Sequence, residues 1–147
     1  MGRPEGLSGT KLSVRNLFVT VNSKHFDDLI SAIGETGVDI EEIIPVGISA
    51  SNPFLTEKQK TAGCLVMNIG AETVTLSLYD DGYLQAIQVL ALGGNDITND
   101  IALGFKISLE EAESIKLGSL IKDISKRKLD EIVEARLIDM MELVDSF

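Results

Sequence analysis

Residues 65–103, LVMNIGAETVTLSLYDDGYLQAIQVLALGGNDITNDIAL, contain the pattern that decides the fold. An apolar run reaches a small-residue turn at 70–71, and the stretch 73–79 then alternates polar and apolar side chains. Alternation with a period of two predicts a strand, and the Asp-Gly pair at 81–82 predicts a reversal into a third strand. That strand is expected to end at the glycines 93–94, before a helix. The pattern predicts a hairpin that brings backbone groups close to a ligand.

Composition narrows the classes of protein to which the chain can belong. It has 147 residues, of which 44% are hydrophobic, so it is long enough for one compact domain or a piece of one. The formal net charge of −10 repels phosphate backbones and argues against nucleic-acid binding. Cys64 is the single cysteine and has no partner for an internal disulfide, which is typical of a cytoplasmic protein. Neither a signal peptide nor a membrane span of ~18 apolar residues is found.

Four elements are expected before the hairpin: a strand at 17–21, a helix at 24–35, a turn with a short strand at 39–46, and a helix at 47–60. Ser23 is the expected N-cap of the first helix, and Pro53 is expected to kink or restart the second. Thr56 and Gln59 have the spacing of a capping box. The first helix is expected to bury four apolar residues, Phe26, Leu29, Ile30 and Ile33.

Three helices are expected after the hairpin. The first covers 96–103 and stops at Gly104, and the second covers 109–117 behind a Ser108/Glu111 capping box. The last, at about 126–144, carries a continuous apolar stripe. The stripe is made of Leu129, Ile132, Val133, Leu137, Met140, Met141 and Val144. Strands and helices in this order predict a layered α/β or α+β fold with a mixed sheet.

Common catalytic and metal motifs are missing from the sequence. His25 is the only histidine and does not lie in the surroundings of a catalytic triad. The sequence holds no Cys-x-x-Cys pair, zinc spacing, EF-hand loop or P-loop. No catalytic residue is therefore assigned, and the metal ligands stay open.

The two glycine turns, at 70–73 and 93–95, are the candidate sites for nucleotide phosphates. Glycine lets backbone N–H groups approach a phosphate without a Cβ in the way, and a following helix N-terminus adds partial positive charge. The alternative interpretation is that both are ordinary tight turns.

Several strings resemble the FtsA family of bacterial cell-division proteins, within the actin-like ATPase superfamily. They are VMNIGAETVTLSLYDDG, GGNDITNDIALGF, LEEAESIK, the upstream VGISASNPFLTEKQKTAG and the later LDEIVEARLIDMMELV. The resemblance covers nearly the whole chain in order. It implies an actin-like (ribonuclease H-like) α/β fold with two lobes around an ATP cleft, of which this chain is expected to be an internal fragment. Residues 1–12 would end an inserted subdomain or form a linker, 13–64 would end the first lobe, and 65–147 would form much of the second lobe.

The resemblance also implies a nucleotide site. Glu113 and Lys116, three residues apart on one helix face, match a pair that reaches the ribose and adenine in this superfamily; without the resemblance they predict a surface salt bridge. ATP, with magnesium, is the implied cofactor. The implied nucleotide-binding residues are Gly70, Ala71, Thr73, Gly93, Gly94, Asn95, Glu113 and Lys116.

Four residues depart from the family's hairpin pattern, among them Ala71 in place of a glycine. Asn68 and Thr75 stand where the pattern has aspartates, and Glu72 stands where it has glycine. Asn68 offers no charged carboxylate to a magnesium-bound water, and Glu72 brings negative charge to the place where a phosphate would approach. The departures predict weakened binding and no efficient hydrolysis.

The resemblance implies a division scaffold that polymerises and tethers the tubulin-like FtsZ ring at the cytoplasmic face of the inner membrane. Membrane attachment would use segments absent from this chain. The FtsZ tail is expected near the last helix, with Glu134 and Arg136 as contacts, although Arg136 could instead pair with Glu131 or Asp139. The alternatives are a PilM-like pilus-assembly adaptor, an actin-like ATPase with real turnover, and a degenerate fragment without independent function.

Overall fold

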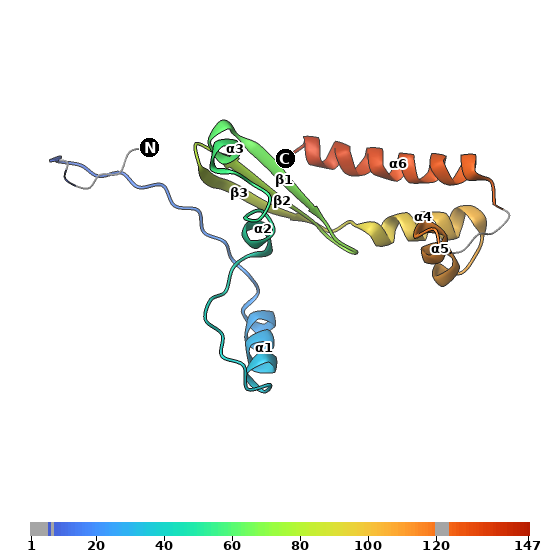
Figure 1. Cartoon of the computed structure of the whole chain (residues 1–147), viewed down its shortest axis with the longest axis horizontal. Helices are drawn as coiled ribbons and strands as arrows, with labels where there is room; N and C mark the ends of the chain where they lie inside the picture. Colours follow the sequence, from blue (N-terminus) through green and yellow to red (C-terminus); the bar gives the residue numbers. More distant parts are fainter. Residues whose placement is uncertain (1–5, 7, 120–123) are drawn as a thin grey trace. The chain divides into compact units, whose positions relative to one another are not determined.

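The computed structural model of the protein describes residue 6 and residues 8–119 and 124–147 (Figure 1). Its elements in chain order are α1 (Ser23–Gly34), α2 (Val46–Ser49), α3 (Glu57–Ala62), β1 (Cys64–Ile69), β2 (Val74–Asp80), β3 (Tyr83–Leu90), α4 (Gly94–Phe105), α5 (Leu109–Lys116) and α6 (Lys126–Asp145). None of the helices in these residues is long and apolar enough to cross a membrane.

The strands form a three-stranded sheet in the order β1-β2-β3, with β2 in the centre. A two-residue turn joins β2 to β3, and both of its residues have positive φ, 53° at Asp81 and 80° at Gly82. These angles are those of a type I′ turn, whose twist matches an antiparallel hairpin. The reversal predicted from the Asp-Gly pair is confirmed. Most of β2 is buried, including its polar residues Thr75 and Ser77.

The chain divides into two compact units, and the first contains residues 1–66 and 77–87. In this unit α3 is fixed to the β2–β3 hairpin, because the Gly82 amide donates to the Lys60 carbonyl at 3.1 Å. The Lys60 ammonium also lies 5.8 Å from the centre of the Tyr79 ring. Thr56 and Gln59 form the predicted capping box at the start of α3.

The predicted strands at 17–21 and 39–46 are wrong, because neither range contains a strand and Val46 already begins α2. A strand needs a neighbour for its backbone N–H and C=O groups, and the sheet of the described residues consists of β1, β2 and β3. The predicted helix at 47–60 is divided into α2 and α3, with Pro53 in the turn between them. Proline therefore restarts the helix rather than bending it.

Helix α1 forms as predicted, with two differences. Asn22, not Ser23, is the N-cap, since its side-chain oxygen accepts from the amides of Lys24 and His25 at 3.0 and 3.3 Å. The expectation that α1 buries its apolar stripe is also wrong. No residue of α1 is buried, and the side chain of Leu29 is 60% exposed.

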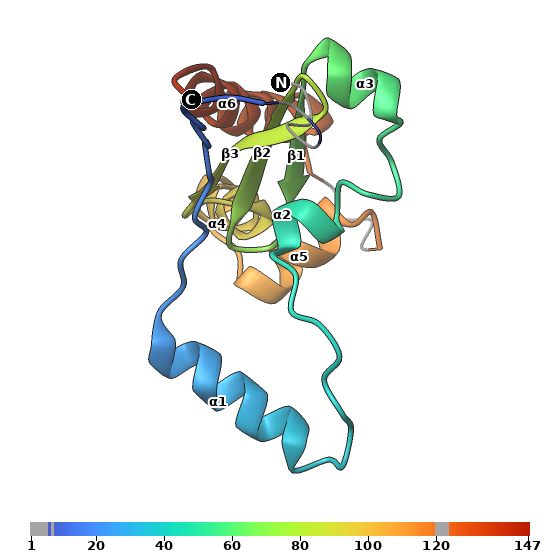
Figure 2. The same cartoon turned by 90° about the vertical axis from the view of Figure 1, so that its left-hand side faces the viewer.

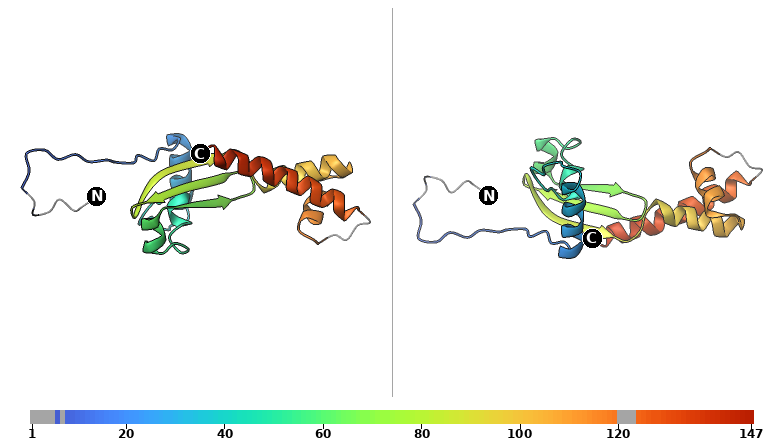
Figure 3. Two further views of the ribbon diagram at one scale, coloured as in Figure 1. Left: turned by 90° about the horizontal axis from the view of Figure 1, so that it is seen from above. Right: turned by 90° about the horizontal axis from the view of Figure 1, so that it is seen from below.

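The second unit contains residues 67–76 and 88–147, and its core lies around α4. Helix α4 packs against both α5 and α6 (Figures 2 and 3). Ile101 and Ala112 have no exposed surface and Ala102 is 8% exposed. The residues packed around these three are Ile97, Phe105, Ile107, Leu129, Ile132 and Val133.

Helix α4 ends later than predicted, because the glycine that was expected to end it is needed for packing against α6. Gly104 was expected to end α4, but the helix continues to Phe105 and is capped by Lys106 in the left-handed region, with φ 55°. A Cβ at Gly104 would lie 2.5 Å from Cδ1 of Ile132 on α6. This glycine therefore serves helix packing and does not end the helix. Helices α5 and α6 agree with their predictions to within a residue, and Ser108 with Glu111 caps α5.

Candidate functional site

The tip of the β1–β2 hairpin is bonded to the first turn of α4. The Gly94 amide donates to the Gly70 carbonyl at 2.9 Å, and the Asn95 amide donates to the Ala71 carbonyl at 2.8 Å. We call this pair of backbone bonds the hairpin clamp. It joins the two glycine turns that the sequence singled out.

Gly93 is the residue that permits this approach. A Cβ at this position would lie 2.5 Å from the Ala71 carbonyl oxygen and 2.7 Å from that of Gly70. Its φ of −173° is extended backbone, which any residue adopts. The requirement for glycine here comes from space alone.

The other backbone amides of this turn also have acceptors within the protein. The Gly93 amide donates to the Asp96 carboxylate at 2.7 Å, and the Asp96 amide donates to the Gly93 carbonyl at 3.1 Å. The N–H groups of residues 93–96 are therefore all engaged, and the partial positive charge of the α4 N-terminus is directed at the hairpin and at Asp96. Within the described residues, the amides of Ala71 and Glu72 at the hairpin tip have no such acceptor.

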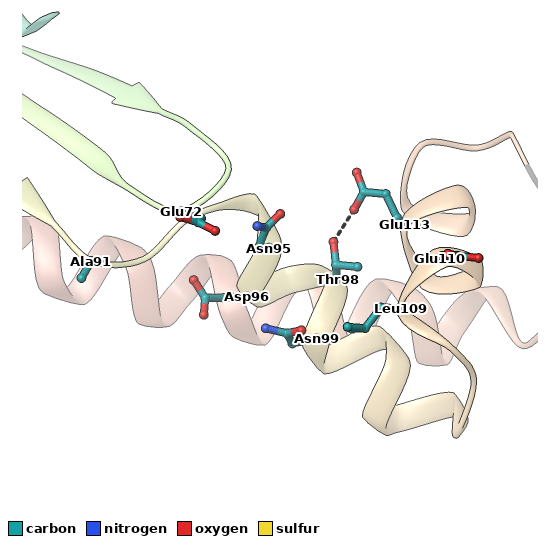
Figure 4. Close-up of a pocket in the computed structure, with 9 residues that line it drawn as sticks. All are labelled: Glu72, Ala91, Asn95, Asp96, Thr98, Asn99, Leu109, Glu110 and Glu113. Atoms are coloured by element: carbon teal, nitrogen blue, oxygen red, sulfur yellow. Dashed lines mark hydrogen bonds between the residues drawn. The ribbon is translucent and has the colours of Figure 1, made fainter. Parts of the chain in front are cut away.

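An open pocket of about 720 Å³ lies beside the hairpin tip, between α4 and α5 (Figure 4). Its lining residues are Glu72, Ala91, Asn95, Asp96, Thr98, Asn99, Leu109, Glu110 and Glu113. Four of these carry carboxylates and none is a lysine or arginine. The lining is therefore acidic, and an anionic ligand would have to rely on backbone amides.

Glu113 and Lys116 lie together on α5, as predicted, and both contact α4. The Lys116 ammonium donates to the Gly94 carbonyl at 3.0 Å and to the Thr98 hydroxyl at 2.8 Å, and it lies 2.7 Å from a Glu113 carboxylate oxygen. The pKa of Glu113 is lowered, first because Lys116 and then because Thr98 hydrogen-bonds to the carboxylate. Both interactions stabilise the ionised form.

Some of the other residues singled out in the sequence line the pocket, and others do not. Glu72 and Asn95 line it, whereas Asn68 and Thr75 do not. Thr75 is buried in β2, with 4% exposed surface.

Sequence reasoning did not find Thr98 or Asp96. Thr98 lies four residues after Gly94 and so on the same face of a helix, which is the signal that was available.

Arg136 and Glu134, the predicted partner contacts, project from different faces of α6. The Arg136 guanidinium forms a two-bond pair with Asp100 of α4, at 2.6 and 2.9 Å, and Asp139 lies farther away at 3.8 Å. Glu134 is exposed, and Glu131 pairs with Arg127 instead. The hydrogen bonds that the guanidinium donates to Asp100 raise the pKa of Arg136. Arg136 therefore ties α6 to α4 while it keeps 31% of its side chain exposed.

The ion pair between Arg136 and Asp100 is expected to stabilise the packing of α6 on α4. Because both side chains are about seven-tenths buried and share two charge-assisted bonds, we expect a coupling energy of about 1–2 kcal/mol. A double-mutant cycle of Asp100→Asn and Arg136→Met, followed by urea unfolding, measures it. The exposed Arg127–Glu131 pair on the same helix is the matched control and should give about 0.5 kcal/mol or less. Equal coupling in the two cycles would show that Arg136 does not anchor α6.

A family model described as cell division protein FtsA matches residues 65–140, just over half of the chain. Cell division protein FtsA of Bacillus subtilis (strain 168) is 30% identical over 137 residues, which are 92% of this chain and 31% of that protein. The chain spans about two fifths of the length of the first curated FtsA proteins that it matches.

Solved structures share the fold. The PilM–PilN type IV pilus biogenesis complex matches with a TM-score of 0.64 and 22% identity, over 83% of this chain and 35% of that one. MreB 5 of Spiroplasma citri bound to AMPPNP matches with a TM-score of 0.68 and 17% identity, over 86% and 47%. Likeness at this level concerns the fold alone, and the predicted actin-like fold is confirmed.

Proposed function

The chain belongs to the family of cell division protein FtsA, and from this premise we propose that its parent protein is a division-site scaffold that binds ATP and hydrolyses it slowly. Nucleotide would act as a structural or switching ligand. The observation that carries the proposal is the hairpin clamp beside the pocket, because it holds the hairpin tip rigidly at one wall of a ligand-sized space.

The residues at the pocket fit the two ends of a nucleotide. The free amides of Ala71 and Glu72 are the phosphate donors at the hairpin tip, and Glu113 is the acceptor at the opposite wall. In this proposal the glycine turn before α4 supports the hairpin and does not bind phosphate itself. Among the described residues no group of three or more His, Cys, Asp or Glu could hold a metal ion. Magnesium would therefore arrive with the triphosphate, whose charge it offsets against the acidic lining.

Slow turnover follows from the same residues. Glu72 lines the pocket with a negative charge, and Asn68, in β1, has a neutral amide where the family pattern has a carboxylate. The Asn68 amide cannot act as a general base toward water, and the charge of Glu72 repels the phosphate on which that water would act. An actin-like ATPase with fast turnover is the alternative, and the rate of phosphate release distinguishes the two.

Assembly at the division site is the second part of the proposal. We place the FtsZ tail at α6, where Glu134 is exposed and Arg136 is accessible in part, together with self-association into filaments. We also propose that this assembly forms at the cytoplasmic face of the inner membrane. The likeness to PilM concerns the fold alone, so no specific observation favours the pilus-assembly adaptor.

The proposal is tested by magnesium-ATP binding to the full-length parent protein and to its Glu72→Gly variant, with phosphate release followed in the same samples. Removing the carboxylate from the hairpin tip should tighten binding about fivefold, which corresponds to ~1 kcal/mol of relieved repulsion. Turnover should stay slow in both proteins, because Asn68 is unchanged.

Glu72→Gln is the matched control, since it removes the charge and keeps the side chain. Equal tightening in the two variants assigns the effect to charge, and tightening in Glu72→Gly alone assigns it to the space at the tip. Absence of nucleotide binding in all three proteins would refute the nucleotide part of the proposal. Rapid phosphate release would favour the ATPase alternative.

A further inference from the structure

The turn between β2 and β3 brings a carboxyl group next to an unshielded backbone nitrogen. Asp81 and Gly82 form the only Asp-Gly pair in the sequence, and Asp81 is exposed to solvent. Because glycine has no Cβ, nothing on Gly82 itself blocks the approach of the preceding side chain to its nitrogen. The turn is therefore the place in this chain where an aspartyl side chain can react with the main chain.

The reaction is an isomerisation that uses only water. The Gly82 nitrogen attacks Cγ of the protonated Asp81 carboxyl group, so that a C–N bond forms and a Cγ–O bond breaks. The proton of the nitrogen and the hydroxyl of the carboxyl group leave together as water, and a cyclic imide remains. Water then opens the imide at the former main-chain carbonyl carbon. The product is isoaspartate, in which the chain runs through Cγ and the mass is unchanged.

Two features of the folded turn oppose the attack. The Gly82 nitrogen must give up its proton, but its N–H group donates to the Lys60 carbonyl of α3 at 3.1 Å. In a type I′ turn the first central residue also has a ψ of about 30°, which directs the next nitrogen away from that residue's own side chain. The nitrogen can therefore attack only after the turn has changed its geometry and lost its bond to α3.

Helix α3 lies directly against the turn. A Cβ at Gly82 would be 3.7 Å from Oγ1 of Thr61. The side chain of Lys60 is 15% exposed, and its ammonium lies 5.8 Å from the centre of the Tyr79 ring. The helix has only six residues and begins at the Thr56/Gln59 capping box. Because so short a helix is not stable by itself, its cap and its packing decide how often it leaves the turn.

We propose that Asp81 is a site of covalent modification, at which isoaspartate forms when α3 leaves the turn, and that the docked α3 holds this reaction back. Isoaspartate adds a methylene to the main chain of a two-residue turn. The Gly82 N–H group then no longer meets the Lys60 carbonyl, so α3 does not dock in the same way again. The modification is independent of nucleotide binding.

The test measures isoaspartate at residue 81 in the full-length parent protein during incubation at neutral pH. Protein L-isoaspartyl methyltransferase with labelled S-adenosylmethionine is the probe, and peptide mapping assigns the label to residue 81. We expect the native protein to form isoaspartate about tenfold more slowly than the same protein unfolded in guanidinium chloride. The factor corresponds to the hydrogen bond that must break before the attack.

Thr56→Ala tests the role of α3 in this protection. It removes the side chain that caps α3, so we expect isoaspartate to form about fivefold faster in the native protein. Thr56→Ser keeps a capping hydroxyl and should react at the rate of the parent protein. Asn22→Ala is the matched control, because it removes the cap of α1 in the same compact unit and should leave the rate unchanged.

The other outcomes contradict the proposal in distinguishable ways. Absence of isoaspartate in the unfolded protein would refute the site, and equal rates in the native and unfolded protein would refute its protection. Equal acceleration by Thr56→Ala and Asn22→Ala would assign the protection to the stability of the whole unit, and acceleration by neither would assign it to the turn alone. If thermal unfolding shows that Thr56→Ala is not folded, Gln59→Ala, which removes the other half of the capping box, replaces it.

Discussion

Replacing Gly93 with alanine is expected to lower the free energy of unfolding by about 1–3 kcal/mol and to remove measurable ATP binding. The added Cβ would lie 2.5 Å from the Ala71 carbonyl oxygen and 2.6 Å from its carbonyl carbon. Both are backbone atoms at a hairpin tip, so no side-chain rotation relieves the contact. The tip must move away from α4, which breaks the hairpin clamp and displaces the amides proposed to bind phosphate.

Gly94→Ala is the matched control for this substitution. A Cβ there would have ordinary contacts, 3.6 Å from the Lys116 ammonium and 3.7 Å from the Gly70 carbonyl oxygen. Because residue 94 begins α4, alanine also has the better helix propensity. Urea unfolding and ATP titration of both variants should separate them clearly. If Gly93→Ala behaves like Gly94→Ala, the hairpin tip can move away from α4 without a loss of stability or of ATP binding.

Ile101→Ala is expected to have the largest effect on stability, lowering the free energy of unfolding by about 2–5 kcal/mol. Ile101 has no exposed surface and lies at the centre of the cluster formed by α4, α5 and α6. Its truncation removes apolar contacts with both neighbouring helices and leaves a cavity that three helices would have to close. The midpoint and slope of a urea denaturation curve measure the change.

Leu103 provides the comparison within the same helix. It lies two residues from Ile101 but is 77% exposed, so Leu103→Ala should change stability by less than about 0.5 kcal/mol. The difference between the two truncations reports the burial of one face of α4. Similar losses in the two variants would mean that Leu103 is covered in solution by a partner or a second copy of the chain.

Features that depend on a few neighbouring residues could be read from the sequence. The type I′ turn at Asp81 and Gly82 and the capping boxes at Thr56 and Ser108 are of this kind, because each is completed within four residues. The apolar stripe of α6 likewise predicted its length and part of its inward side: Met140 is 2% exposed, but Leu137 and Met141 of the same stripe are 40% and 42% exposed.

Features that depend on tertiary neighbours could not be read in the same way. A strand at 17–21 has the right residue types, but its formation needs a partner strand that the pattern cannot supply. Gly104 looks like a helix stop until its approach to Ile132 is known. The spacing of Thr98 places it on the helix face of Gly94, but only the packing of α4 on its two neighbours gives Thr98 and Asp100 their partners.

The position of α4 has a consequence for how this sequence can change over evolutionary time. The hairpin clamp fixes the start of the helix. The hydrogen bond between Thr98 and Lys116 fixes one of its faces, and the ion pair between Asp100 and Arg136 fixes another. Few positions of the helix can be substituted without a change elsewhere, and the exposed Leu103 is one of these few. A side chain at Gly104 would force Cδ1 of Ile132 to move, so larger residues at 104 are expected together with smaller ones at 132. Among relatives of this chain we therefore expect covariation between α4 and its neighbours more than identity at single positions.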